Sequence, residues 1–168
     1  MSYVDVKTET APHSTVATAV KPKTISTVFQ CLVVSESRSR RDMLMLAAND
    51  AGWDTVVCAE PETALAEADR TKFRMALIDF EGHGVGLGSS PGMRRLCQHL
   101  SSGNSDLLMC VCGREGDAEE EIWARQLGVW LYLPGVDHGE HVSLLCDEGR
   151  QIAEKLAGPQ RSGVPAGA

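Results

Sequence analysis

The feature that most constrains the fold of this chain is the alternation of five short apolar runs with five segments of helical periodicity. The runs have the length of β-strands, and the segments between them place apolar residues three and four positions apart, as an amphipathic helix does. Parallel strands require crossover connections of this kind, and the crossing helices cover both faces of the sheet. The alternation therefore predicts an α/β fold with a doubly wound, five-stranded parallel sheet and helices on both faces.

The limits of the elements come from residues that start or stop them. Strands are predicted at Phe29 to Val34, Thr55 to Ala59, Met75 to Asp79, Leu107 to Cys112 and Leu131 to Leu133. Helices are predicted at Arg38 to Ala51, Pro61 to Asp69, from Ser90, from Asp117 to Leu127 and from Asp137 onward. Asp117 with Glu120, and Asp137 with Glu140, have the spacing of capping boxes. The last helix is predicted to bury a stripe of Val142, Leu145, Cys146, Gly149, Ala153 and Leu156.

The length of the chain suits one folded domain between two tails. It has 168 residues, 43% of them hydrophobic, and a chain of this size can bury roughly two thirds of its unfolded surface. Residues 1–27 show no sustained periodicity, and residues 158–168 are rich in Gly, Pro and Ser. We therefore expect a disordered N-terminal tail, a domain at 28–157 and a flexible C-terminal tail.

The composition of the chain excludes several classes of partner. The formal net charge is −7, whereas affinity for a phosphate backbone comes from clustered Lys and Arg. The six cysteines lie in apolar runs or on apolar helix faces, where they act as small hydrophobic side chains. No apolar stretch has the length of a membrane span, and no secretory pattern precedes the first strand. We therefore expect a cytoplasmic protein that binds neither nucleic acid nor membrane.

One carboxylate stands out against this apolar background. Asp79 closes the run Met75 to Ile78 and is followed by a Gly-rich stretch. A buried strand of this kind delivers its last residue to the sheet edge formed by the carboxyl ends of the strands, where open α/β folds place their sites. The sequence thus predicts a site at Asp79.

Two further motifs accompany Asp79. Val33 to Glu36 end the first strand, and Gly128 to Pro134, with the sequence Gly-Val-Trp-Leu-Tyr-Leu-Pro, lead into the fifth. With Asp79, these motifs make residues 28–157 resemble the receiver domain of two-component response regulators. The resemblance implies a flavodoxin-like sheet of order 2-1-3-4-5, Asp79 as phosphoacceptor and Tyr132 as the switch aromatic residue.

The pocket departs from the receiver pattern at three positions. Receivers hold Mg²⁺ with two acids after the first strand and the phosphoacceptor, but Ser35 takes one of these places and leaves only Glu36. Cys112 replaces the Ser or Thr that ends the fourth strand, and Gly135 replaces the lysine beyond the fifth. Hydroxyls are poor Mg²⁺ ligands and thiols are weak donors. The resemblance therefore implies a pseudo-receiver in which Asp79 is phosphorylated inefficiently or not at all, with at most a weak Mg²⁺ site at Glu36 and Asp79 and no other cofactor.

The residues of this predicted pocket also allow other interpretations. Asp79 can serve as a loop-satisfying carboxylate, and Glu36 as a solvated loop acid. Ser35, Ser37 and Ser39 form a hydroxyl-rich loop in the position where flavodoxins bind a flavin phosphate, although Ser is also a common helix cap. A flavodoxin-like phosphate- or nucleotide-binding protein or enzyme is therefore the alternative function.

Two tryptophans precede the predicted fifth strand, Trp123 in the predicted fourth helix and Trp130 directly before the strand. Trp123 and Trp130 lie near the surface formed by the fourth helix, the fifth strand and the fifth helix, through which receivers dimerise or meet partners. Aromatic residues dominate binding hot spots, although the fourth helix can equally cover the Trp130 indole. No Ser/His/Asp or Cys/His relay can be assembled from the sequence. We therefore expect a stand-alone signalling module that is not an enzyme and that contacts a histidine kinase, another signalling protein or a second copy of itself.

Overall fold

The computed structural model describes residues 29–81 and 90–158. They form a five-stranded parallel sheet in the order β2-β1-β3-β4-β5, which confirms the predicted fold class and strand order. The strands are β1 (Gln30–Val34), β2 (Asp54–Cys58), β3 (Met75–Asp79), β4 (Leu108–Gly113) and β5 (Leu131–Pro134). The helices are α1 (Arg38–Asp50), α2 (Pro61–Arg70), α3 (Pro91–Gly103), α4 (Ala118–Leu127) and α5 (Gly139–Ala157).

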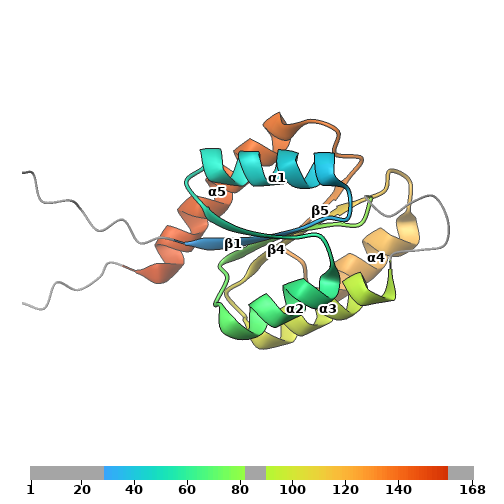
Figure 1. Ribbon diagram of the computed structural model, residues 1–168, viewed down its shortest axis with the longest axis horizontal. Helices are drawn as coiled ribbons and strands as arrows, with labels where there is room; N and C mark the ends of the chain where they lie inside the picture. The colour runs from blue at the N-terminus through green and yellow to red at the C-terminus, as the bar shows by residue number, and fades with distance from the viewer. Residues whose placement is uncertain (1–28, 82–89, 159–168) are drawn as a thin grey trace, which may run out of the picture.

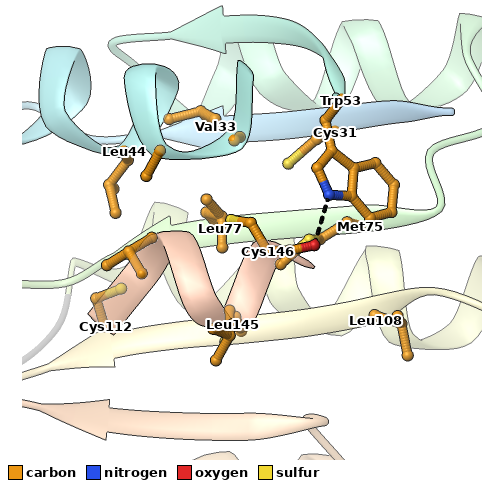
Figure 2. Packing of buried hydrophobic residues seen from close by; sticks show 14 of the residues in the cluster. Cys31, Val33, Leu44, Trp53, Met75, Leu77, Leu108, Cys112, Leu145 and Cys146 are labelled. Atoms are coloured by element: carbon orange, nitrogen blue, oxygen red, sulfur yellow. Dashed lines mark hydrogen bonds between the residues drawn. The ribbon is translucent and has the colours of Figure 1, made fainter. Parts of the chain in front are cut away.

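The molecule has three layers, with α1 and α5 on one face of the sheet and α2, α3 and α4 on the other (Figure 1). Because successive side chains of a strand point to opposite faces, the core divides into two clusters. Leu77 and Cys146 belong to the cluster under α1 and α5, whereas Phe80 and Leu96 belong to the cluster over α2 to α4. Figure 2 shows the first cluster, in which Trp53 Nε1 donates a hydrogen bond of 2.9 Å to the carbonyl oxygen of Cys146.

The strand order explains why two apolar runs are continuous. β3 and β4 lie inside the sheet with helices on both faces, and every residue of both strands is buried. Asp79, the last residue of β3, is therefore carried into the interior along with its apolar neighbours.

Of the two predicted helix caps, the structure has one and lacks the other. The Asp117 side chain caps α4 as predicted, because its Oδ1 accepts a hydrogen bond from the Glu120 N–H at 3.0 Å. The predicted cap at Asp137 is wrong: α5 begins at Gly139, and its N-cap residue, His138, makes no side-chain cap. The predicted stripe of α5 is buried except at Leu156, which is 55% exposed near the end of the helix.

The six cysteines are all buried and free, in agreement with their apolar sequence context. None of the helices in the described part of the chain is long and apolar enough to cross a membrane. The tails predicted at 1–27 and 158–168 lie outside the described residues, apart from Gly158.

Candidate functional site

The carboxyl ends of the strands bring the predicted pocket residues to one edge of the sheet. Asp79 ends β3 and pairs in register with Cys112 of β4. Ser35 follows β1 directly, and Gly135 follows β5. This edge is where the sequence predicted a site, and the sheet order places β1, β3 and β4 side by side there.

The Asp79 carboxylate is completely buried, and both of its oxygens accept hydrogen bonds. Oδ2 lies 2.7 Å from the Ser35 hydroxyl and 2.9 Å from Arg40 Nε. Oδ1 accepts a hydrogen bond of 3.2 Å from the backbone N–H of Glu81. Burial of a carboxylate is costly unless the charge is paired and hydrogen-bonded, and here it is both.

The positive charge comes from Arg40, in the first turn of α1, whose side chain is only 17% exposed. Its Nη1 donates a hydrogen bond of 2.9 Å to the carbonyl oxygen of Val136, between β5 and α5. Its Nη2 forms an ion pair of 3.0 Å with Glu81 Oε2. One guanidinium group therefore joins the start of α1 to the segments that follow β3 and β5.

The charge state of this group is set by its neighbours. Burial alone would lower the pKa of Arg40, but the hydrogen bond and charge of Asp79, together with the charge of Glu81, outweigh burial and raise the pKa. The guanidinium is therefore charged, and it pairs with the carboxylates of Asp79 and Glu81.

Arg40 and Glu81 were not among the residues that the sequence analysis assigned to the site. Arg38, Arg40 and Arg41 look alike in the sequence as a small basic cluster at a helix start. The available signal was indirect: a carboxylate predicted at the end of a buried strand, without its usual cation-binding partners, requires a positive charge from elsewhere in the chain.

The other predicted pocket positions, Cys112, Gly135 and Glu36, lie at or near the same edge of the sheet. Cys112 is fully buried, and burial, followed by the charge of Asp79, raises the pKa of its thiol to about 12. Gly135 has φ of 62°, a left-handed conformation in which a lysine would be strained. Glu36 is exposed, and Arg41 Nη1 reaches its carbonyl oxygen at 3.4 Å.

The serine-rich loop does not gather its three hydroxyls around one point. The Ser35 hydroxyl faces Asp79 inside the protein. Ser37 Oγ and Ser39 Oγ lie 3.2 Å apart, in an exposed hydrogen bond with each other. Ser37 occupies the N-cap position of α1 without a side-chain cap. These contacts do not favour the phosphate-binding alternative, in which the three hydroxyls would share a ligand.

Tyr132 points inward at the next strand end. Its hydroxyl donates a hydrogen bond of 3.0 Å to Glu120 Oε1, which also accepts a 3.2 Å hydrogen bond from the Arg114 N–H. Burial, followed by the charge of Glu120, raises the pKa of the Tyr132 phenol. The ring fits because residue 113 is glycine: a Cβ there would overlap the phenol and Glu120 Oε1.

The two tryptophans are half-buried. Trp123 packs against Phe80, with ring centroids 5.6 Å apart, and the Arg94 guanidinium lies 4.8 Å from its ring centroid. Trp130 packs against the core cluster under α1 and α5, where Gly149 leaves room for the indole. Helix α5, on the opposite face from α4, thus covers part of Trp130.

The fold of this chain is similar to that of several solved structures. No protein-family model matches the chain, and no curated protein matches it. A CheY-like response regulator receiver domain protein from Methanospirillum hungatei aligns with a TM-score of 0.65 at 16% identity, over 77% of this chain and 98% of that one. The chemotaxis protein CheY4 of Vibrio cholerae gives 0.58 at 20% identity, over 73% and 98%. An orphan response regulator of H. pylori gives 0.58 at 12% identity, over 74% and 96%. The fold is that of receiver domains.

The receiver fold raises the question of Mg²⁺, and the residues present do not fit it. Among residues 29–81 and 90–158, no group of three His, Cys, Asp or Glu side chains is placed to hold a metal ion. The Oδ2 atom of Asp79 already faces the Arg40 guanidinium, and a divalent cation beside it would be repelled. Ser35 and exposed Glu36 do not replace the missing acidic pair.

Proposed function

We propose that this protein is a receiver-like signalling module, formed by residues 28–157, that works by protein contact and is not an enzyme. In this proposal Asp79 is phosphorylated inefficiently or not at all. One observation carries the proposal: both oxygens of the buried Asp79 carboxylate are bound by donors of the protein itself. A nucleophilic oxygen must be reached by the donor phosphorus, whereas this carboxylate is completely buried and its Oδ2 atom is paired with Arg40.

Transition-state stabilisation is weakened in the same place. Charge that develops on a transferring phosphoryl group is normally neutralised by metal ions and basic side chains. The lysine position is Gly135, the Cys112 thiol is a weak donor, and the charge of Arg40 is already balanced by Asp79 and Glu81. Each lost charge-assisted hydrogen bond corresponds to roughly 1.5 to 3 kcal/mol.

The test is direct exposure to small phosphodonors. The full-length protein is incubated with acetyl phosphate, or with beryllofluoride as a mimic, in the presence of Mg²⁺. We expect no acyl phosphate by intact-mass spectrometry and no change in the amide NMR signals of Asp79 and Glu81. A receiver with a complete acidic pocket is the positive control. Stoichiometric modification with shifts throughout the pocket would refute lost phosphorylation while leaving the contact role in place.

The partner surface is proposed at α4, β5 and α5, and the partner is a histidine kinase, another signalling protein or a second copy of the chain. Trp123 and Trp130 belong to this surface only through the parts of their rings that stay exposed. Ile122 on α4 and Leu144 on α5 are 56% and 68% exposed, and the sequence analysis did not select them. These two side chains are the positions on α4 and α5 at which the proposed surface can be tested.

A matched set of charge substitutions tests this surface through self-association. We expect Ile122→Asp and Leu144→Asp each to weaken dimerisation at least about tenfold, because a buried apolar contact of about 1.4 kcal/mol is lost. Sedimentation equilibrium measures the association constant. Leu46→Asp is the control, since Leu46 is also 56% exposed but lies on α1. Equal effects from all three variants, or a wild-type protein that stays monomeric, would exclude a dimer through this surface.

A further inference from the structure

The pocket contains a positive charge where the receiver fold leads one to expect a metal ion. We propose that Arg40 is a built-in replacement for a dissociable cation, which makes the fold independent of divalent metal, and that removing its side chain opens a Mg²⁺ site at Asp79 and Glu81. The inference goes beyond the proposed signalling role, because it concerns metal dependence and holds whether or not a partner binds.

The contacts of the guanidinium group carry the first step. Arg40 presents Nε to Asp79 Oδ2 at 2.9 Å and Nη2 to Glu81 Oε2 at 3.0 Å, so the two carboxylates flank a single positive charge. The guanidinium is planar and carries several fixed donors, which suits it to contact separate acceptors at once. The third acceptor is the carbonyl oxygen of Val136, at 2.9 Å.

Burial carries the second step. Asp79 is inaccessible, and the side chains of Arg40 and Glu81 are only 17% and 29% exposed. Beyond their ion pair, Arg40 Nη2 and Glu81 Oε2 are buried without a hydrogen-bond partner. Within the described part of the chain, the guanidinium of Arg40 is therefore the positive charge that balances both carboxylates. Without it, the two negative charges would repel each other.

The third step concerns what the site becomes without Arg40. Mg²⁺ in proteins is usually held by one or two carboxylates and several waters. Truncation at position 40 leaves the carboxylates of Asp79 and Glu81 beside the space vacated by the guanidinium, together with the Ser35 hydroxyl and the Val136 carbonyl. The same truncation removes the charge that repels an incoming cation, so the acidic pair and the space for a hydrated ion appear together.

The experiment compares thermal unfolding of the full-length protein in EDTA and in millimolar Mg²⁺. We expect the wild type to melt at the same temperature in both. Arg40→Ala should melt lower in EDTA by roughly 6 to 20 °C, as expected for a buried charge that loses its partner. Mg²⁺ should then restore part of the loss in a saturable manner, as a ligand specific for the folded state does.

Two further variants separate the charge from the side chain. Arg40→Lys keeps a positive charge, so it should melt between the wild type and Arg40→Ala and should not respond to Mg²⁺. Arg38→Ala is the control on the same helix, because the Arg38 side chain is 88% exposed, and it should behave as the wild type. The phosphodonor test uses a different readout, so either proposal can fail without the other.

Two results would overturn the inference. One is a wild-type protein that Mg²⁺ stabilises as much as it stabilises Arg40→Ala. The other is an Arg40→Ala variant that folds but whose melting temperature does not respond to Mg²⁺. If Arg40→Ala fails to fold in either buffer, an NMR titration of the wild type and Arg40→Lys decides, because Mg²⁺-dependent shifts at Ser35 and Glu81 in the wild type would also refute it.

Discussion

Replacing Gly113 with alanine is expected to lower the free energy of unfolding by about 3 kcal/mol or more and to displace the Tyr132 ring from its inward position. A Cβ at residue 113 would overlap the Tyr132 phenol and Glu120 Oε1. Overpacking of a buried site costs about 1 to 3 kcal/mol, and a buried Glu120 carboxylate that loses its donors adds a further 1 to 3 kcal/mol. Urea denaturation measures the change in stability, and the Tyr132 ring signals in NMR report its position.

A matched glycine and a double variant make this prediction specific. Gly103→Ala is the control, because Gly103 lies in the last turn of α3 and a Cβ there meets nothing within 4 Å. It should be neutral or stabilising by up to about 1 kcal/mol. Adding Tyr132→Ala to Gly113→Ala should cost less than the sum of the two single changes. Strict additivity would mean that the ring does not depend on the missing side chain at residue 113.

The contact of Tyr132 with Glu120 bears on the proposed function. A switch residue must leave one position for another when the pocket changes state. Here the phenol donates a hydrogen bond to the buried Glu120 carboxylate and lies against Gly113, whereas Cys112, which pairs with Asp79, belongs to the core cluster on the opposite face of the sheet. In the proposed function, this hydrogen bond would hold Tyr132 in one position.

The sheet could be predicted from the sequence because burial alone determines where apolar residues occur in its central strands. β3 and β4 read as continuous apolar runs since helices cover both of their faces. The place of Asp79 followed from the same pattern, because the last residue of a central parallel strand must lie at the carboxyl edge. Local spacing also identified Asp117 as the cap of α4.

The partners of the buried charges could not be predicted, because they depend on how helices are oriented over the sheet. Arg38 and Arg40 are the same residue type in the same helix start, so the sequence does not distinguish them. In the structure, the Arg38 side chain is 88% exposed, whereas the Arg40 side chain is packed against Asp79. Glu120 was expected to return to the start of its own helix. Instead its carboxylate turns to the Arg114 N–H, just after β4, and to the Tyr132 hydroxyl, a contact that exists only once β5 and α4 are packed together.

Replacing Asp79 with asparagine is expected to destabilise the protein by about 3 kcal/mol, and the sign of this change distinguishes this pocket from an acidic one. Where several carboxylates crowd a metal site, neutralising one of them relieves repulsion and stabilises the apo-protein. Asp79 instead faces a guanidinium, and removing one charge of a buried pair typically costs 3 to 5 kcal/mol. We choose the lower end of that range because Arg40 keeps its ion pair with Glu81.

The hydrogen bonds of Asp79 also predict that Asp79→Asn destabilises the protein. Ser35, Arg40 and the Glu81 N–H all approach Asp79 as donors, and between them they use both carboxylate oxygens. Asparagine has one acceptor oxygen, so its amide nitrogen must face either the Glu81 N–H or the pair formed by Ser35 and Arg40. Whichever orientation it takes, at least one buried donor loses its acceptor, at a cost of about 1 to 3 kcal/mol.

Urea denaturation of Asp79→Asn, alone and combined with Arg40→Ala, measures the effect and its origin. The double variant should be more stable than the sum of the single losses predicts, since each single change removes a partner of the charge that the other change removes. Asp106→Asn is the control: Asp106 pairs with Arg74 at 3.3 Å but its side chain is 50% exposed, so the loss should stay below about 1 kcal/mol. Stabilisation by Asp79→Asn would show that repulsion among acids, and not attraction to Arg40, governs this pocket.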